Sequence, residues 1–578
     1  MSFLWDLSAI RPQTDVVMPG DTLPAIFWNA VDKRGPAIWL RQKEFGIWRS
    51  WTWTEVGQAV REIGHGLLSI GFDSRETASI LSNTNVEWVL CDIAVLSANG
   101  VSNGIYPTDA AEQVQYLCED SRTTVLFVED DEQLDKALEV RERLPGLRKI
   151  VVFDMEGLRD FHDPMVISLA ALRALGREHL KSHRNALNER VAAVQPQDLA
   201  ILVYTSGTTG KPKGATWTHR TVRVVIMNYL ADVHNIQPGE VVLHAAPMSH
   251  GSGIVALPAV ARAATNVVLD TKSFEPKQLF ALIQQMKVSH IAFLAPTQII
   301  KMLEEFEPGA FDLSSLKAIC YGGAPIYVEH LRSAIKAFGP VFAQIYGQGE
   351  SPITITGLNA AEHARLLAEG DARIGSAGTI RTDVEAHCVD EQDNPLPAGQ
   401  AGEIVVRGDV VMAGYWNNPD ATAEAMRGGW LHTGDIGMFD ENGYLFLLDR
   451  AKDMIISGGN NVYPREVEEV LVRHPAIATA VVFGIPHEYW GEAVHAVVVC
   501  EPGQPLTAEQ VIEYCGRNMA GYKKPKSVDF MDALPVSGYG KVMRREIRES
   551  YWQGHTSRIG GGAPTPTTPA KGTEETKS

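Results

Sequence analysis

Residues 199–214 read LAILVYTSGTTGKPKG. The first six residues form an apolar run that favours a buried strand, and the next ten contain four hydroxyl side chains, three glycines and two lysines. Glycines let backbone N–H groups approach an anion, hydroxyl groups donate to phosphate oxygens, and lysines add positive charge. The loop is therefore predicted to hold a polyphosphate, and the alternative is a solvated surface turn. It is not a Walker A loop, because no glycine stands five positions before a Gly-Lys-Ser/Thr.

Helix and strand patterns alternate on both sides of this loop. Apolar residues from Val56 to Leu67 recur at helical spacing, with Thr54 placed to cap the helix. Further helices are predicted at 87–96 and 131–144, and strands at 78–81, 124–128, 149–153, 241–245, 266–269, 290–294 and 316–321. This alternation predicts an α/β fold class, with a large N-terminal domain of β-sheets covered by helices.

The pattern changes after Gly402. Short strands at 403–407, 443–448 and 454–456 favour a meander or a small barrel-like part. A helix starting at Pro464, strands at 478–483 and 495–500, and a helix at 508–519 indicate a separate α+β domain. We predict a large domain over residues 1–450, a small C-terminal domain over 453–551 and a disordered tail over 557–578.

Composition excludes several classes of protein. The chain of 578 residues is 45% hydrophobic and 21% charged, which is typical of a folded globular protein. Its formal net charge of −18 opposes nucleic-acid binding. The six cysteines are far apart, which suits a reducing compartment. No signal peptide or membrane-spanning run is evident, since even the apolar stretch 251–269 contains Arg262 and Asn266, so a cytoplasmic location is predicted.

Further stretches extend the pattern begun by YTSGTTGKPKG (204–214). They are APMSHG (246–251), YGGAP (321–325), YGQGE (346–350), WLHTGD (430–435), DRAKD (449–453) and GK (540–541). Together they resemble, in order, the motifs of the acyl-adenylate-forming superfamily of acyl-CoA synthetases, luciferases and peptide-synthetase adenylation domains. The resemblance covers about residues 20 to 551. It implies an enzyme that joins a carboxylic acid to the α-phosphate of ATP, releases pyrophosphate and transfers the acyl group to CoA.

The resemblance also implies site residues. The expected catalytic residues are Lys541, which would contact the carboxylate and the phosphate, His250 at the mouth of the acyl pocket, and Glu350, which would hold Mg²⁺ together with Thr205. Tyr346 is expected to stack on adenine and Asp435 to accept hydrogen bonds from the ribose. The full set expected to bind ATP or AMP is Thr205, Ser206, Gly207, Thr208, Thr209, Gly210, Lys211, Gly323, Ala324, Tyr346, Gly347, Asp435 and Arg450.

Movement of the small domain is a further implication. Lys452 matches the hinge position of the family, and Gly458 and Gly459 match a loop that lines the CoA channel after the small domain rotates. The candidate contacts to the CoA phosphates are Lys523, Lys524, Lys526, Arg544 and Arg545, and the alternative is that this basic run is only a solvated surface. One departure is that the family often has threonine directly before the metal-binding glutamate, whereas this chain has Gly349.

The acid is less defined than the reaction. Small apolar residues near 246–256, 321–326 and 346–356 leave space for a long chain or a ring. The segment 51–144 looks most like long-chain fatty acyl-CoA synthetases, so a medium- or long-chain fatty acid is expected, with an aryl or cyclic acid as the alternative. Acyl transfer to a carrier protein or to oxygen, and a nucleotide-binding module without catalysis, stay open. The expected partners are small molecules, and the sequence does not decide between a monomer and a homodimer.

Overall fold

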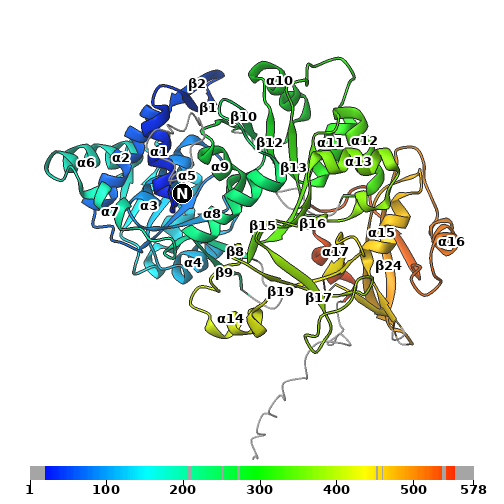
Figure 1. The fold of residues 1–578 in the computed structure, drawn as a ribbon. Helices are drawn as coiled ribbons and strands as arrows, with labels where there is room; N and C mark the ends of the chain where they lie inside the picture. The colour runs from blue at the N-terminus through cyan, green and yellow to red at the C-terminus, as the bar shows by residue number, and fades with distance from the viewer. Residues whose placement is uncertain are drawn as a thin grey trace, which may run out of the picture. The chain divides into compact units, whose positions relative to one another are not determined.

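The computed structural model describes residues 20–205, 211–249, 251–269, 274–324, 326–450, 453–457, 460–487, 489–536 and 542–552 (Figure 1). These residues divide into two compact units. The larger unit contains the chain up to Leu447 together with Val536, and the smaller unit contains the described residues from Leu448 to Pro535 and from Val542 onward. Both units combine helices and sheets, so the predicted α/β class is confirmed.

A seven-stranded sheet carries the glycine-rich stretch. Its order is β7-β6-β5-β3-β4-β8-β9, and all neighbours are parallel except β8 and β9. The strands are β3 (Thr77–Leu81), β4 (Val101–Ile105), β5 (Thr123–Val128), β6 (Lys149–Val152), β7 (Val166–Ser168), β8 (Leu199–Thr205) and β9 (Lys213–Thr218). Because Thr205 pairs with Lys213, the β8–β9 hairpin brings the two ends of the predicted phosphate loop together.

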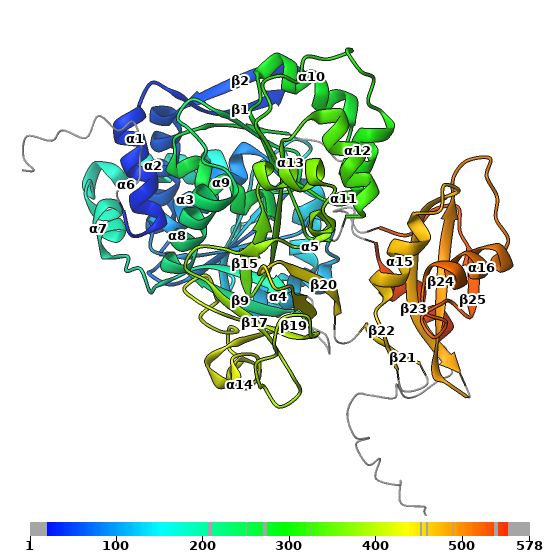
Figure 2. The same cartoon turned by 45° about the vertical axis from the view of Figure 1, so that its right-hand side comes forward.

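A nine-stranded sheet forms the second layer of the larger unit (Figure 2). Its order is β16-β15-β14-β13-β12-β10-β11-β1-β2, with parallel neighbours from β14 to β1 and antiparallel pairs at both ends. The strands are β1 (Ile38–Glu44), β2 (Ile47–Thr52), β10 (Val241–His244), β11 (Thr265–Val268), β12 (His290–Leu294), β13 (Ala318–Tyr321), β14 (Phe342–Gln348), β15 (Ser351–Leu358) and β16 (Thr379–Ile380).

Helices cover these sheets, and one apolar cluster joins both sheets through α3 and α9. This cluster contains Leu40 of β1, Ile80 of β3, Ala94 of α3 and Ala256 of α9. The helices of the larger unit are α1 (Leu23–Arg34), α2 (Trp53–Ser69), α3 (Val86–Ser97), α4 (Ala111–Asp120), α5 (Asp131–Val140), α6 (Leu169–Ser182), α7 (Ala186–Ala193), α8 (His219–Asn228), α9 (Gly251–Ala261), α10 (Pro276–Met286), α11 (Pro296–Glu304), α12 (Val328–Phe338), α13 (Ala360–Glu369) and α14 (Pro419–Ala425). No described helix has the length and apolar character needed to cross a membrane.

The cap of α2 differs from the prediction. Thr52, not Thr54, precedes the first helical residue. Its hydroxyl accepts a hydrogen bond from the backbone N–H of Glu55, and the Glu55 carboxylate accepts from the backbone N–H of Thr52 at 2.7 Å. This reciprocal capping box satisfies two backbone donors at once, which explains why Thr52 takes the cap position.

The predicted meander is a sheet of four strands that are neighbours in chain order, and its β17–β18 and β18–β19 pairs are antiparallel. They are β17 (Glu385–Val389), β18 (Gly402–Arg407), β19 (Leu431–Phe439) and β20 (Leu445–Arg450). In the strand order β17-β18-β19-β20, β17 and β20 are the two edge strands. It carries Asp435 on β19.

The smaller unit is a helix-covered sheet with a separate cluster of buried apolar residues on each face. Val482, Ala496 and their neighbours pack with α15 and α16, whereas Val481, Phe483 and Val497 pack with Ile547 of α17. This split follows from the alternation of side chains along a strand. The elements are β21 (Ile455–Ser457), β22 (Asn460–Val462), α15 (Pro464–Val472), β23 (Ile477–His487), β24 (Gly491–Cys500), α16 (Ala508–Asn518), β25 (Ser527–Phe530) and α17 (Arg544–Tyr551).

Two glycines allow α2 and α6 to pack closely in the larger unit. A Cβ atom added at Gly176 of α6 would lie 1.7 Å from the carbonyl oxygen of Glu62 in α2. One added at Gly66 of α2 would lie 2.4 Å from the carbonyl oxygen of Leu172 in α6. Because both obstacles are backbone atoms, a larger residue at either position would force the helices apart.

Gly176→Ala should therefore destabilise the larger unit by about 2 kcal/mol or more, as overpacking does in a tight core. Leu175→Ala on the same helix is the control, because Leu175 is 44% exposed and its loss should cost within about 0.5 kcal/mol. Calorimetric unfolding should give a lower melting temperature for Gly176→Ala alone. Equal melting temperatures for the two variants would contradict the close-packing argument.

Candidate active site

The carboxylate of Glu350 joins three segments that are far apart in the sequence. Glu350 follows Gly349 in the turn between β14 and β15 and is only 9% exposed. Its Oε1 accepts hydrogen bonds from Thr205 Oγ1 and from the Tyr415 hydroxyl, both at 2.8 Å. Since Thr205 ends β8, the predicted phosphate loop begins beside the predicted metal-binding residue.

Tyr415 was not predicted from the sequence. It lies on a backbone segment, residues 412–416, that runs beside β9: the N–H of Ala413 donates to the carbonyl of Thr216 at 2.9 Å, and the N–H of Thr216 donates to that of Gly414 at 3.0 Å. Burial and the charge of Glu350 raise the pKa of the Tyr415 hydroxyl, so it stays protonated and donates. The Gly-Tyr-Trp sequence gives no signal of this role, because its partner Glu350 is 65 residues away.

Tyr346 and Asp435 form a second pair. The Tyr346 hydroxyl donates to Asp435 Oδ2 at 2.8 Å, which connects β14 to β19. The backbone N–H of Asp435 donates to Thr433 Oγ1 at 3.1 Å. The structure thus brings together the two residues that the sequence assigned to adenine and ribose. Tyr346 lies near the end of β14, and Glu350 lies four residues later in the turn that follows this strand.

The predicted residues that follow β13 lie at the same sheet edge. Gly323 and Ala324 lie two and three residues after the end of β13, which is parallel to β14, so they share an edge with Tyr346 and Gly347. Gly323 is exposed and has a φ of +74°, a conformation that favours glycine. Ligands commonly bind at the carboxyl ends of parallel strands in α/β sheets, and this edge is such a place.

The surroundings of Gly349 show why this chain has glycine where the family often has threonine. Its carbonyl accepts a hydrogen bond from Trp217 Nε1 at 2.7 Å, and a Cβ atom at this position would lie 2.2 Å from Thr205 Cγ2. The Thr205 methyl group therefore occupies the space that a side chain at 349 would need. In this position the Thr205 hydroxyl points to Glu350, so the absence of a side chain at 349 permits the Thr205–Glu350 hydrogen bond.

Lys211 lies against an aromatic ring at the far end of the phosphate loop. Its Nζ is 4.8 Å from the ring centroid of Tyr116, and the Tyr116 hydroxyl donates to the carbonyl of Pro212 at 2.7 Å. Lys213 has a similar arrangement, with Nζ 5.1 Å from the ring centroid of Tyr415. Both ammonium groups lie on aromatic faces next to the loop, an arrangement that suits an anionic ligand.

Several predicted residues fall outside the described part of the chain. They are Ser206, Gly207, Thr208, Thr209, Gly210, His250, Lys452, Gly458, Gly459 and Lys541, together with the tail 557–578. Arg450 is described and belongs to the smaller unit, where its carbonyl accepts from the N–H of Asp453 at 2.9 Å. The predicted roles of all these residues remain predictions.

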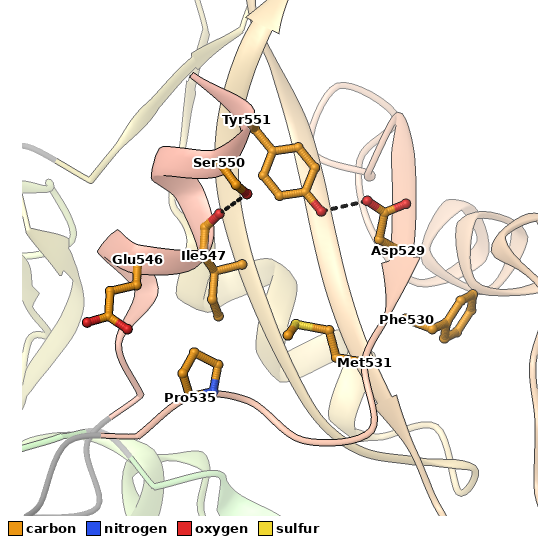
Figure 3. A pocket seen from close by; sticks show the side chains of 8 residues that line it. All are labelled: Asp529, Phe530, Met531, Pro535, Glu546, Ile547, Ser550 and Tyr551. Carbon is orange, nitrogen blue, oxygen red and sulfur yellow. Dashed lines mark hydrogen bonds between the residues drawn. The ribbon is translucent and has the colours of Figure 1, made fainter. Parts of the chain in front are cut away.

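A hollow of about 540 Å³ lies in the smaller unit, between β25 and α17 (Figure 3). Asp529, Met531 and Ile547 are among its lining residues, and the Tyr551 hydroxyl donates to Asp529 Oδ2 at 2.6 Å across it. None of the predicted site residues lines this hollow. It is therefore distinct from the Glu350 and Tyr346 clusters of the larger unit.

The larger unit thus joins Thr205, where the predicted phosphate loop begins, to a buried carboxylate, and it pairs a tyrosine with an aspartate, as expected of a nucleotide-binding enzyme that activates acids. Residues 27–416 match a family model described as AMP-binding enzyme, and residues 466–541 match one described as AMP-binding enzyme C-terminal domain. The chain belongs to this family of AMP-binding enzymes. It is an ATP-dependent, AMP-forming ligase of the acyl-CoA synthetase type, with CoA as cosubstrate.

Three relatives illustrate the range of the family. The medium/long-chain-fatty-acid–CoA ligase FadD8 of Mycobacterium tuberculosis is 32% identical over 85% of this chain and 84% of its own. A feruloyl-CoA synthase of Amycolatopsis sp. is 38% identical over 61% and 70%. The fatty acid–[acyl-carrier-protein] ligase ScoC of Streptomyces coeruleorubidus is 31% identical over 87% and 92%. A solved structure, the anthranilate CoA ligase AuaEII in complex with anthranoyl-AMP, shares the fold with a TM-score of 0.78 and 23% identity, covering 92% of this chain and 97% of that one.

Gly349→Ala should lower kcat/KM for ATP roughly tenfold, because the new methyl group displaces Thr205 and removes a hydrogen bond to a charged carboxylate. Thr205→Ser lacks Cγ2 and keeps the hydroxyl, so it should restore most of the activity when it is combined with Gly349→Ala. Steady-state kinetics of both single variants and the double variant check this. A double variant as impaired as Gly349→Ala alone would contradict the steric explanation.

Proposed function

We propose that this enzyme activates a medium- or long-chain fatty acid and transfers the acyl group to free CoA. The observation that carries the proposal is the Thr205–Glu350 hydrogen bond, which joins the phosphate loop to the carboxylate that the resemblance assigns to metal binding. In the first step a carboxylate oxygen of the acid attacks the α-phosphorus of ATP and pyrophosphate leaves. In the second step the CoA thiol, as thiolate, attacks the acyl carbonyl and AMP leaves.

Residue roles in the first step follow from charge. Lys541 would bridge the carboxylate and the α-phosphate, two anions that repel each other until a cation stands between them. Asp435, oriented by the Tyr346 hydroxyl, would accept hydrogen bonds from the ribose. The loop 205–211 would hold the β- and γ-phosphates, with Lys211 at its end. His250 is proposed at the entrance of the acyl pocket.

The residues present fit Mg²⁺. Glu350 and Thr205 offer oxygen ligands, the type that this hard cation prefers. Among the described residues no three His, Cys, Asp or Glu side chains converge on one point, so ATP phosphates and water would complete the coordination. When bound, the ion would offset phosphate charge. Tyr415 and Thr205 both bond Oε1 of Glu350, and they would thereby fix the plane of its carboxylate.

The smaller unit carries a surface that suits the nucleotide part of CoA. Tyr489 is 78% exposed and Trp490 38%, and Lys526 Nζ lies 5.6 Å from the ring centroid of Trp490. An exposed aromatic ring can stack on a base while a neighbouring lysine binds a phosphate. Lys524, two residues before Lys526, adds to this positive surface. Rotation of this unit about Lys452, with Gly458 and Gly459 lining the thiol channel, is part of the proposal.

Support for the acid comes from relatives along most of the chain. FadD8 is named for medium- and long-chain fatty acids, and ScoC for fatty acids passed to a carrier protein. The feruloyl-CoA synthase favours an aryl acid as the second candidate, although its match covers less of this chain. A carrier protein in place of free CoA is the alternative acceptor.

Pyrophosphate release with ATP and Mg²⁺ tests the reaction and the acid. Straight-chain, aryl and cyclic acids should be compared with CoA present and omitted; we expect the highest rate with a medium or long straight chain and CoA present. Lys541→Ala should lower the rate of pyrophosphate release about 100-fold or more, because the variant removes a group that stabilises the transition state. Lys277→Ala, an exposed lysine on α10, is the control and should keep its activity. A preference for aryl acids, or turnover independent of CoA, would overturn the corresponding part of the proposal.

Trp490→Ala and Lys526→Glu should each raise the KM for CoA about tenfold, the value of one lost stacking or charge contact. Formation of acyl-AMP, measured as pyrophosphate exchange without CoA, should be unchanged because these residues would contact only the thiol substrate. Lys181→Glu, an exposed lysine on α6, is the matched control for charge reversal. An unchanged KM for CoA in both variants would remove this surface from the proposal.

A further inference from the structure

The β1–β2 hairpin lies at the edge of the nine-stranded sheet (Figure 1). Two large apolar side chains at its tip are exposed to solvent. Phe45 is fully exposed and Ile47 is 75% exposed, and they flank Gly46 at the tip. The nucleotide site and the proposed CoA surface use no residue of this hairpin. Single exposed apolar residues are ordinary, but two on either side of one glycine at a protruding tip need an explanation.

The backbone makes the phenylalanine more unusual. Phe45 has a φ of +48° and Gly46 a φ of +83°, and Glu44 pairs with Ile47 across the turn. Two central residues with positive φ are typical of a type I′ turn, whose first position is normally asparagine, aspartate or glycine. A bulky residue is disfavoured there on steric grounds. The chain therefore keeps an aromatic ring at a position where folding alone would favour asparagine.

The hairpin itself is rich in basic and aromatic residues. Residues 38–52 contain Arg41, Lys43 and Arg49 against Glu44, a net charge of +2 in a chain of −18. Trp48 and Trp51 are half-buried behind the tip, and the Arg49 guanidinium lies 4.7 Å from the ring centroid of Trp51. Tryptophan is enriched where proteins meet the polar surface of a membrane, and basic residues are attracted to anionic lipids.

We propose that this hairpin binds an anionic lipid surface, with Phe45 and Ile47 inserted among the lipid chains and Lys43 near the headgroups. Two apolar side chains are far fewer than the roughly 20–30 residues a side of a stable protein interface. Binding at a membrane surface instead combines a small inserted apolar area with attraction between basic residues and anionic lipids. Arg49 and Ser50 are exposed on β2, and polar residues on an edge strand oppose pairing with a second copy of the chain. The proposal holds whichever acid the enzyme uses.

Cosedimentation of the full chain with vesicles tests the proposal. Vesicles of phosphatidylcholine alone should bind weakly, and vesicles that also contain phosphatidylglycerol should bind more strongly, with the difference reduced by salt. Phe45→Asn should weaken binding to the mixed vesicles about tenfold. Because asparagine suits the turn, the same variant should melt at an equal or higher temperature, so lost binding cannot be attributed to misfolding.

Leu175→Ser replaces an apolar residue of α6 that is 44% exposed, and it is the matched control that should leave vesicle binding unchanged. Lys43→Glu should weaken binding to mixed vesicles but not to phosphatidylcholine alone. Wild type that does not sediment with either vesicle, or Phe45→Asn that binds as wild type does, would overturn the proposal. A dimer seen by light scattering that Phe45→Asn dissociates would assign the hairpin to contact between copies instead.

Discussion

The hydrogen bonds on the Glu350 carboxylate are the constraint on which the site depends. A carboxylate that is 9% exposed is costly unless donors surround it, and here Thr205 and Tyr415 each donate to Oε1. Those donors come from the end of β8 and from the segment 412–416, so the charge can be satisfied only when both segments are in place. The site therefore forms only when both of these segments have folded against Glu350.

Small residues around this carboxylate have a steric purpose. Gly349 leaves room for the Thr205 methyl group and lets Trp217 reach its carbonyl oxygen. At Gly347 an added Cβ would lie 2.4 Å from the backbone nitrogen of Ile353, which is too close for any side chain. The β14–β15 turn is therefore folded tightly against its neighbours. This tight packing fixes where Tyr346 and Glu350 lie relative to each other, the two residues that the proposal assigns to adenine and to Mg²⁺.

Periodicity and motif order in the sequence were sufficient to predict the α/β class and the strand before the phosphate loop. They also singled out Tyr346 and Asp435, which the structure joins by a hydrogen bond, while the nucleotide roles of both residues stay predictions. They could not predict Tyr415, because its role depends on a backbone pairing with β9 that no local pattern encodes. The cap of α2 was missed because Thr52 and Thr54 are equivalent by residue type, and only the reciprocal bond with Glu55 distinguishes them. The turn at Phe45 was also hidden, since its residue type contradicts its conformation.

This acidic chain must bind ATP, which is a polyanion. Three of its lysines lie on aromatic rings, and this arrangement helps to explain how they can attract phosphate. Lys211 lies over Tyr116, Lys213 over Tyr415 and Lys526 over Trp490. A carboxylate partner would hold a lysine equally well but would cancel its charge, whereas an aromatic face orients the ammonium group and leaves the charge available. This difference matters in a chain with a net charge of −18. If a carboxylate neutralised one of these lysines, the electrostatic potential around it would become negative and would repel phosphate. Aromatic support therefore lets Lys211, Lys213 and Lys526 remain attractive to phosphate in a chain whose net charge repels it.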